Sequence, residues 1–307
     1  MSMLTATDPT TGTVVREVPA VTGEEITAII DRAQNAYTSW KDTTVEERAE
    51  VLRRVAAYMR EHTEELAPLM TEEMGKPIGE ARGEVAKSAW AAEHYAEHAA
   101  EYLAEEHLAS DATSSYVQYL PLGPVLGILP WNAPFWVAFR FCAPALMAGN
   151  TCVMKHDPHV PGCAAALEEV FRAAGAPEGI FQSLLAQTED VEQAIRDPRI
   201  RAVSFTGSDR AGATVASIAA GEIKPAVLEL GGSDPCIVLA DADLQKAAEV
   251  SALSRIINAG QSCIAAKRVI VERSVHDEFV ELLAAQLRDL VVGDPRDPAT
   301  KVGPIAR

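Results

Sequence analysis

The segment GNTCVMKHDPHVPGCAAALEEVFRAAG, residues 149–175, decides the fold class of this chain. Residues 151–155 form a short apolar run that predicts a buried strand. Residues 163–174 carry apolar side chains at three- and four-residue spacing, which predicts a helix, and a proline-containing loop joins the two. A strand that leads through a short link into a helix is the repeating unit of α/β proteins.

The same alternation continues on both sides of this segment. We expect strands at 125–129, 181–184 and 202–205 and helices at 138–147, 189–197 and 211–220. Short links between them predict a doubly wound, Rossmann-like parallel sheet. Three earlier helical patterns, at 24–40, 45–65 and 80–107, predict an N-terminal helical layer.

A second unit is expected to begin at residue 224. The strand PAVLEL (225–230) opens it, followed by a strand at 236–239, a helix from Asp243, a strand at 268–272 and a helix at 275–290. These few elements do not close a sheet. The sequence therefore predicts a complete unit at 1–223 and an incomplete α/β unit at 224–307.

Composition excludes several classes of function. The chain has 307 residues, 48% of them hydrophobic, and a net charge of −17 without a basic run, so nucleic acid is not an expected partner. No apolar stretch approaches the ~20 residues that span a bilayer, and the N-terminus lacks a signal-peptide pattern. We therefore expect a soluble, cytoplasmic protein without membrane contacts.

The five cysteines are odd in number and form no CxxC pattern, which argues against a disulfide framework and a zinc site. Cys142, Cys152, Cys163 and Cys236 lie in apolar or small-residue surroundings and are expected in the core. His94 and His98 have the spacing of two metal ligands, but no third ligand stands out, so we expect a solvated helix face and no metal.

Five further residues lie at or just after the end of an expected strand. Lys155 ends its strand at the carboxyl edge of the sheet, as a ligand contact or a solvated lysine. Asn132, between two prolines, is an oxyanion donor or a turn residue. Glu229, in an apolar strand, is a general base or half of a salt bridge. Gly207 and Ser208 precede a helix, where they bind a phosphate or only cap it.

Cys263 lies in GQSCIAAK (260–267), between the end of a helix and a strand. A thiol there, next to small residues, is either a nucleophile activated by local dipoles or a buried core residue. Spacing alone leaves both open.

Five motifs, in order, resemble those of the aldehyde dehydrogenase superfamily: PWNAPFW, GNTCVMK, FTGS, LELGGSDP and GQSC. The succinate-semialdehyde dehydrogenase-like branch is the most similar. The resemblance implies that Cys263 is the nucleophile, Glu229 the general base, and Asn132 the oxyanion donor together with the backbone N–H of Cys263. The implied reaction oxidises an aldehyde through a thiohemiacetal and a thioester, with hydride transfer to NAD(P).

The resemblance also assigns cofactor and substrate contacts. Lys155 would bind the adenosine ribose or its phosphate, Gly207 and Ser208 the pyrophosphate, and Trp131 and Leu230 would line the cofactor cleft. Pro158 stands where NAD-preferring relatives often carry a glutamate, so NADP is expected before NAD.

Arg140 matches an arginine that semialdehyde enzymes use for the distal carboxylate, and Ile257 stands where some have a second arginine. Ala265 replaces a second cysteine of some relatives, so a disulfide switch at the nucleophile is not expected.

Members of this superfamily continue beyond residue 307. We therefore expect roughly the last third of the family's length, which includes the rest of the catalytic domain, to be absent here, with apolar surface exposed on the second unit. Residues 114–123 would belong to the arm through which the full-length protein forms a homo-oligomer. The alternatives are an inactive fragment that serves as a dinucleotide-binding or interaction module, and a cysteine-dependent esterase or acyl transferase.

Overall fold

A five-stranded parallel sheet forms the centre of the computed structural model, which describes residues 2–306. The strand order is β7-β6-β5-β8-β9, and every neighbouring pair is parallel. The strands are β5 (Pro124–Leu129), β6 (Thr151–His156), β7 (Phe181–Ser183), β8 (Ala202–Thr206) and β9 (Ala226–Glu229). This confirms the α/β class that the alternation predicts.

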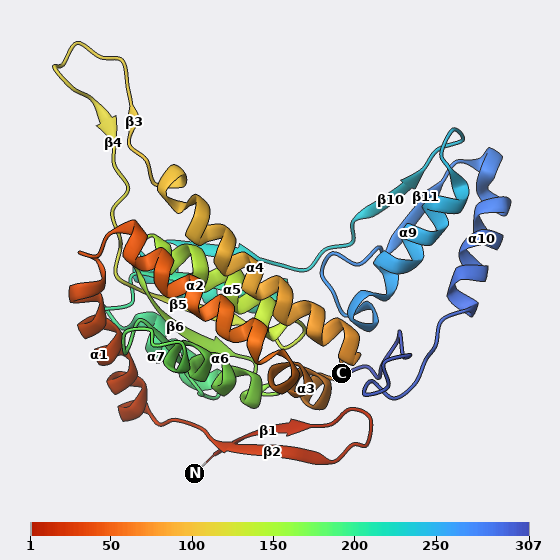
Figure 1. Cartoon of the computed structure of the whole chain (residues 1–307), viewed down its shortest axis with the longest axis horizontal. Coiled ribbons are helices and arrows are strands. Elements are labelled where there is room, and N and C mark those ends of the chain that lie inside the picture. Colours follow the sequence, from red (N-terminus) through yellow and green to blue (C-terminus); the bar gives the residue numbers. More distant parts are fainter. Residues whose placement is uncertain (1, 307) are drawn as a thin grey trace.

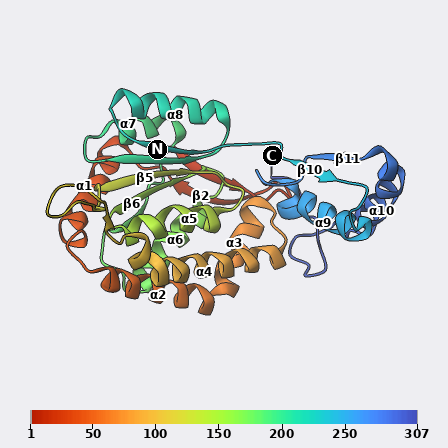
Figure 2. The same cartoon turned by 90° about the horizontal axis from the view of Figure 1, so that it is seen from above.

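Helices cover both faces of this sheet, which is why β6 is buried along its whole length. Figure 2 shows α7 (Val191–Arg196) and α8 (Asp209–Gly221) on one face, where α1 (Gly23–Trp40) packs into the same apolar cluster. The other face carries α2 (Val45–Glu61), α3 (Thr63–Met74), α4 (Ile78–Tyr102), α5 (Pro134–Met147) and α6 (Pro161–Ala173). The expected helical layer is thus present, with α3 as a separate helix.

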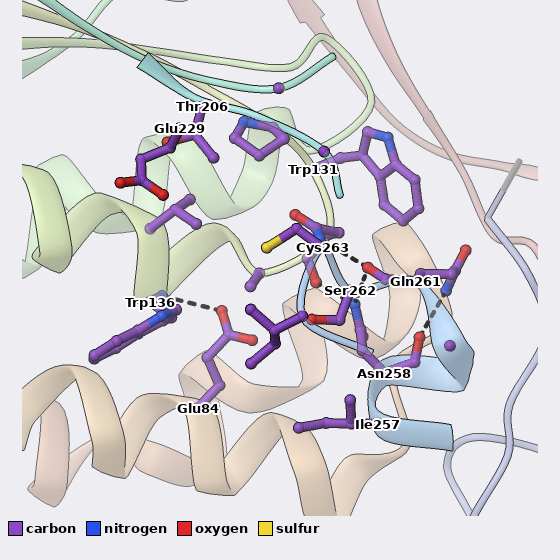
Figure 3. A pocket seen from close by; sticks show the side chains of 18 of the residues that line it. Glu84, Trp131, Trp136, Thr206, Glu229, Ile257, Asn258, Gln261, Ser262 and Cys263 are labelled. Atoms are coloured by element: carbon purple, nitrogen blue, oxygen red, sulfur yellow. Dashed lines mark hydrogen bonds between the residues drawn. The ribbon is translucent and has the colours of Figure 1, made fainter. Parts of the chain in front are cut away.

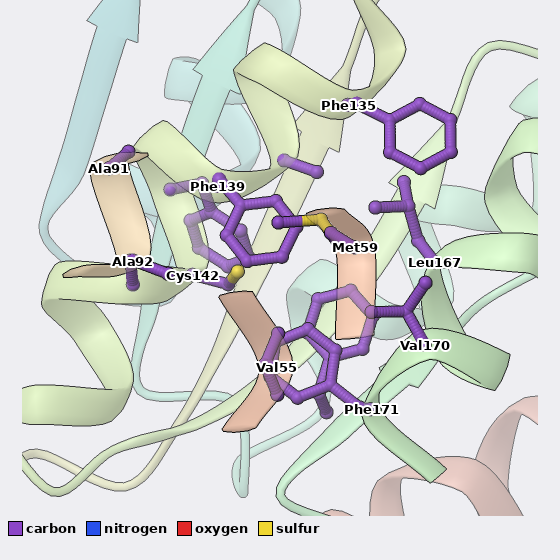
Figure 4. Packing of buried hydrophobic residues seen from close by; sticks show 14 of the residues in the cluster. Val55, Met59, Ala91, Ala92, Phe135, Phe139, Cys142, Leu167, Val170 and Phe171 are labelled. Carbon is purple, nitrogen blue, oxygen red and sulfur yellow. The ribbon is translucent and has the colours of Figure 1, made fainter. Parts of the chain in front are cut away.

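The larger core lies between the helical layer and the sheet. Phe139 and Phe171 stack at 5.8 Å between ring centroids, next to Met59 and Cys142 (Figure 4). Cys142, Cys152 and Cys163 are fully buried here, as the sequence predicts. Burial raises the pKa of these thiols, so they stay protonated and inert.

Two β-hairpins extend from this body (Figure 1). β1 (Met3–Thr7) and β2 (Val14–Pro19) pair antiparallel near the N-terminus and were not expected from the sequence. β3 (Glu106–His107) pairs with β4 (Tyr116–Val117) in a projecting arm. The helix expected to reach residue 107 therefore ends earlier, at Tyr102, and its last residues join this arm.

The second unit consists of two parallel strands and two helices, joined to the sheet by a single linker (Figure 1). These are β10 (Pro235–Val238), α9 (Leu244–Ile256), β11 (Arg268–Val271) and α10 (His276–Arg288). Asp243 caps α9 by accepting a hydrogen bond from the backbone N–H of Lys246. The hydrophobic core of the second unit is small, and the side chains of Ile237, Leu253 and Ile270 are more than half exposed.

The strand PAVLEL differs from the expectation. It was assigned to the second unit, but β9 pairs with β8 and forms the edge of the central sheet. The four residues of β9 are all exposed, so their sequence carries no burial pattern that would indicate pairing with β8.

Three short 3₁₀ helices complete the described elements: η1 (Thr188–Asp190), η2 (Ile257–Gly260) and η3 (Arg273–Val275). In residues 2–306, no helix has the length and apolar character needed to cross a membrane.

Candidate active site

A pocket of about 710 Å³ lies where the carboxyl edge of the sheet, α4 and the second unit meet (Figure 3). Eight of the nine site residues predicted from the sequence line it: Trp131, Asn132, Arg140, Gly207, Ser208, Glu229, Leu230 and Cys263. Lys155, the ninth, is not among the lining residues. The volume lies in the range of small-molecule and cofactor sites.

Cys263 is exposed in this pocket, which excludes the core-thiol alternative. It follows a turn in which three successive residues have left-handed backbone angles: Asn258 (φ 55°), Ala259 (φ 53°) and Gly260 (φ 77°). Such angles cost a non-glycine residue about 1–2 kcal/mol, so surrounding contacts must hold the turn. By contrast, Cys236 is half-buried outside the pocket, with its Sγ 3.4 Å from the Ser251 hydroxyl.

Asn132 links the loop after β5 to the turn before Cys263. Its Nδ2 donates to the carbonyl of Gln261 at 2.7 Å. The backbone carbonyl of Asn132 accepts hydrogen bonds from Asn258 Nδ2 at 2.6 Å and from Lys76 Nζ at 3.0 Å. A primary amide has two N–H donors, so a second one remains for a ligand. Asn132 is therefore a fixed amide rather than an isolated turn residue.

A buried ion pair between Lys76 and Glu84 lies beneath this loop, with 3% and 7% of the side chains exposed. Glu84 Oε1 also accepts from the backbone N–H groups of Phe135 and Trp136, at 2.9 and 3.1 Å, and so caps the first turn of α5. Glu80, one turn earlier on α4, accepts from the backbone N–H of Asn258 at 2.8 Å. Burial raises the pKa of Glu80.

Three charged residues of α4 line the pocket and were not predicted from the sequence: Glu80, Glu84 and Lys87. They recur at four and three residues and so share one helix face. On an Ala/Glu-rich helix this pattern is typical of a solvated surface, which is why it did not indicate a pocket wall.

Glu229 ends β9 and forms an ion pair with Arg140, with 2.9 Å between Oε2 and the guanidinium. The two side chains are 54% and 37% exposed. The salt bridge that the sequence left open is thus present, and it joins the candidate base to the candidate substrate residue. Exposed pairs contribute only about 0–1 kcal/mol, so a ligand can separate them easily.

Ser208 is the N-cap of α8, with its hydroxyl accepting from the backbone N–H of Ala211 at 3.3 Å. Lys155 lies within β6 and is 4% exposed. Burial lowers its pKa, while the carboxylates of Asp157 and Glu189 oppose this shift. A bound anion near Lys155 would therefore stabilise the charged form of its side chain.

In the part of the chain that the structure describes, no group of three His, Cys, Asp or Glu residues is placed to hold a metal. His94 lies on the exposed side of α4, with its ring 4.6 Å from that of His98 and its Nε2 3.1 Å from the Tyr102 hydroxyl.

Residues 2–307 match the model of the aldehyde dehydrogenase family. A probable succinate-semialdehyde dehydrogenase [NADP(+)] of Synechocystis is 47% identical over 299 residues, which are 97% of this chain and 66% of that protein. Succinate-semialdehyde dehydrogenase [NADP(+)] 1 of Mycobacterium ulcerans is 46% identical, over 99% of this chain and 67% of its own length.

Among solved structures, succinic semialdehyde dehydrogenase from Streptococcus pyogenes in complex with NADP+ superposes with a TM-score of 0.95. It is 36% identical, and the match covers 99% of this chain and 67% of that one. The chain thus spans about two thirds of the length of the relatives it matches. The family match and these identities show that the chain belongs to the aldehyde dehydrogenase family.

Proposed function

We propose that this chain carries the nucleophile and cofactor-binding residues of an NADP-dependent aldehyde dehydrogenase, with succinate semialdehyde as substrate. The observation that carries the proposal is the exposed Cys263 in one pocket with Asn132 and Glu229. The names of the relatives support the substrate and the cofactor, because the Mycobacterium ulcerans protein is named a succinate-semialdehyde dehydrogenase [NADP(+)] and the Synechocystis protein a probable one.

In the proposed first step, the Cys263 thiolate adds to the aldehyde carbon and the carbonyl oxygen becomes an oxyanion. The free N–H of the Asn132 amide and the backbone N–H of Cys263 hold this oxyanion. Hydrogen bonds of this kind strengthen as the charge develops, which lowers the barrier. The bond from Asn132 to the Gln261 carbonyl keeps the amide in place without reorganisation.

NADP fits the residues present. Gly207 and Ser208 lie at the N-terminus of the 13-residue helix α8, where the helix dipole favours a phosphate. The buried ammonium of Lys155 gains from a nearby anion. When bound, NADP supplies the acceptor for the hydride that leaves the aldehyde carbon. Trp131 and Leu230 would form the apolar walls of the cofactor cleft.

In the proposed last step, Glu229 accepts a proton from water, and the water oxygen adds to the thioester carbon that Cys263 holds. The carbon–sulfur bond then breaks, which releases the acid and restores the thiolate. For this role Glu229 must leave Arg140, and the exposure of the pair makes that step inexpensive. Arg140 is then free to pair with the distal carboxylate of the substrate.

The test is the absorbance of reduced nicotinamide when the chain is mixed with a panel of aldehydes and NADP or NAD. Reduction that is fastest with succinate semialdehyde and NADP supports the proposal. Dinucleotide binding without reduction would favour a binding module instead. Hydrolysis of activated esters without any dinucleotide binding would favour an esterase or acyl transferase.

Replacing Glu229 with glutamine is expected to lower the steady-state kcat about 100-fold, because a general base contributes at least that factor. The first turnover does not need the base, so a rapid burst of reduced cofactor equal to the enzyme concentration should precede the slow phase. Stopped-flow absorbance measures both phases. Glu222→Gln, which also removes an ion-paired carboxylate but outside the pocket, is the control. An unchanged steady-state rate would contradict the assignment.

Replacing Lys155 with methionine is expected to raise the Kd for NADP about tenfold and that for NAD less, because only NADP carries the additional phosphate. Isothermal titration with each dinucleotide measures the difference. Lys41→Met, at the exposed end of α1, is the matched control. Equal weakening for both dinucleotides would show that Lys155 does not select NADP.

A further inference from the structure

We propose that Lys87 is a second binding residue for the distal carboxylate of the substrate and makes the pocket selective for ω-carboxylated aldehydes. This inference rests on the function proposed above and goes beyond the assignment of Arg140. Lys87 lines the pocket from α4, on the same helix face as Glu80 and Glu84. Its Nζ lies 3.8 Å from the centroid of the Trp136 ring.

The other cations of the pocket already have partners. Lys76 pairs with Glu84, Arg140 pairs with Glu229, and Lys267 Nζ donates to the carbonyls of Gly232 and Cys263 at 2.7 and 2.6 Å. Lys87 rests on the face of an aromatic ring and, within residues 2–306, has no ion pair with a carboxylate. Its charge is therefore available to a ligand.

The aromatic ring also positions this charge. A cation above a tryptophan face gains about 0.5–1 kcal/mol at an exposed site, which restricts a long, flexible side chain to one region. The backbone that carries the ring is fixed, because Glu84 accepts a hydrogen bond from the backbone N–H of Trp136 (Figure 3). Lys87 thus presents its ammonium at one end of the pocket before substrate arrives.

Lys87 and Arg140 flank the same part of the pocket. Trp136 and Arg140 are four residues apart on α5, so their side chains lie on one face of the helix, about 6 Å apart along the axis. The Trp136 ring that holds the Lys87 ammonium thus belongs to the residue one helical turn before Arg140 on α5. In the proposed complex, the distal carboxylate lies between the Lys87 and Arg140 side chains and contacts both cations.

Lys87 decides the balance of charge in the pocket. Glu80, Glu84 and Glu229 line it together with Lys76, Arg140 and Lys267, so Lys87 supplies the positive charge in excess, in a chain whose net charge is −17. An anionic aldehyde is repelled by this field unless local cations outweigh it. When the substrate displaces Glu229 from Arg140, one unpaired carboxylate remains, and Lys87 compensates for it. Ile257, on another wall, is apolar and 42% exposed and offers no charge.

The experiment compares succinate semialdehyde with 4-methylpentanal, in which an uncharged isopropyl group replaces the carboxylate. For Lys87→Met, the ratio of kcat/KM for the charged to the uncharged aldehyde is expected to fall about tenfold, the effect of losing one charge-assisted contact. Lys87→Arg should restore most of the ratio, because it keeps the charge. Lys246→Met, an exposed lysine on α9 outside the pocket, is the control and should keep the wild-type ratio.

A second readout does not depend on turnover. Succinate, the product, should protect Cys263 of the wild-type chain from alkylation by iodoacetamide better than 4-methylpentanoate does, and Lys87→Met should raise the protecting concentration of succinate about tenfold. If the wild-type chain reduces no cofactor, the proposed activity is wrong, but the alkylation experiment still tests whether Lys87 binds the carboxylate. Equal losses for the charged and uncharged ligands, or a loss in Arg140→Met alone, would overturn the role of Lys87.

Discussion

Replacing Cys263 with alanine is expected to lower kcat/KM for every aldehyde by at least about 10⁴-fold, the scale on which a covalent nucleophile contributes. Without the sulfur, no bond forms to the aldehyde carbon, and the oxyanion contacts of Asn132 have no tetrahedral adduct to stabilise. Initial rates of cofactor reduction measure the loss. Dinucleotide binding should stay within about twofold of the wild type, because Cys263 lies outside the helix terminus and lysine assigned to the cofactor.

The matched control is Cys236→Ala, because Cys236 is the other cysteine that is not fully buried and lies outside the pocket. Its activity should remain within about threefold of the wild type. Mass spectrometry after brief iodoacetamide treatment should find the label on Cys263, since the fully buried thiols stay protonated. Activity of Cys263→Ala above one tenth of the wild type would contradict the covalent mechanism.

The apolar runs predicted β5, β6 and β7 of the central sheet because these strands are buried along nearly their whole length. Residues 151–155 were read as a strand from their apolar run alone, and β6 is buried throughout. β9 lacked this signal: its residues are exposed, and its place at the edge of the sheet depends on pairing with β8, which no local pattern records. The hairpin of β1 and β2 was missed for the same reason, since all residues of β2 are at least partly exposed.

The candidate site divides in the same way. The sequence alone was enough to single out Cys263, Asn132 and Glu229 one by one. Each lies at or after the end of a helix or strand and carries a polar group where an apolar one is expected. The segments that carry Asn132 and Cys263 are held from α4, more than 40 residues earlier than Asn132, where Glu84 binds the backbone of Phe135 and Glu80 binds the backbone of Asn258. A carboxylate that caps a distant helix is indistinguishable in sequence from one that faces water. The pairing of Glu229 with Arg140 likewise needed the fold.

Replacing Glu84 with leucine is expected to lower the free energy of unfolding by about 3–5 kcal/mol, the cost of removing one partner of a buried ion pair. The ammonium of Lys76, 3% exposed, would lose its carboxylate, and the backbone N–H groups of Phe135 and Trp136 would lose their acceptor. Urea unfolding followed by circular dichroism measures the change. Glu93→Gln is the control on the same helix: its pair with Arg60 is exposed, so the expected loss is about 0–1 kcal/mol.

Two further variants separate charge from capping. The double variant Lys76→Met with Glu84→Leu removes both charges, so it should recover most of the loss and retain about 1–2 kcal/mol from the two unsatisfied N–H groups. Glu84→Gln keeps an acceptor for α5 but leaves Lys76 unpaired, so it should resemble the single leucine variant more than the wild type. If the double variant is no more stable than Glu84→Leu alone, the buried charge of Lys76 is not the cause of the loss, and the capping of α5 by Glu84 would account for it.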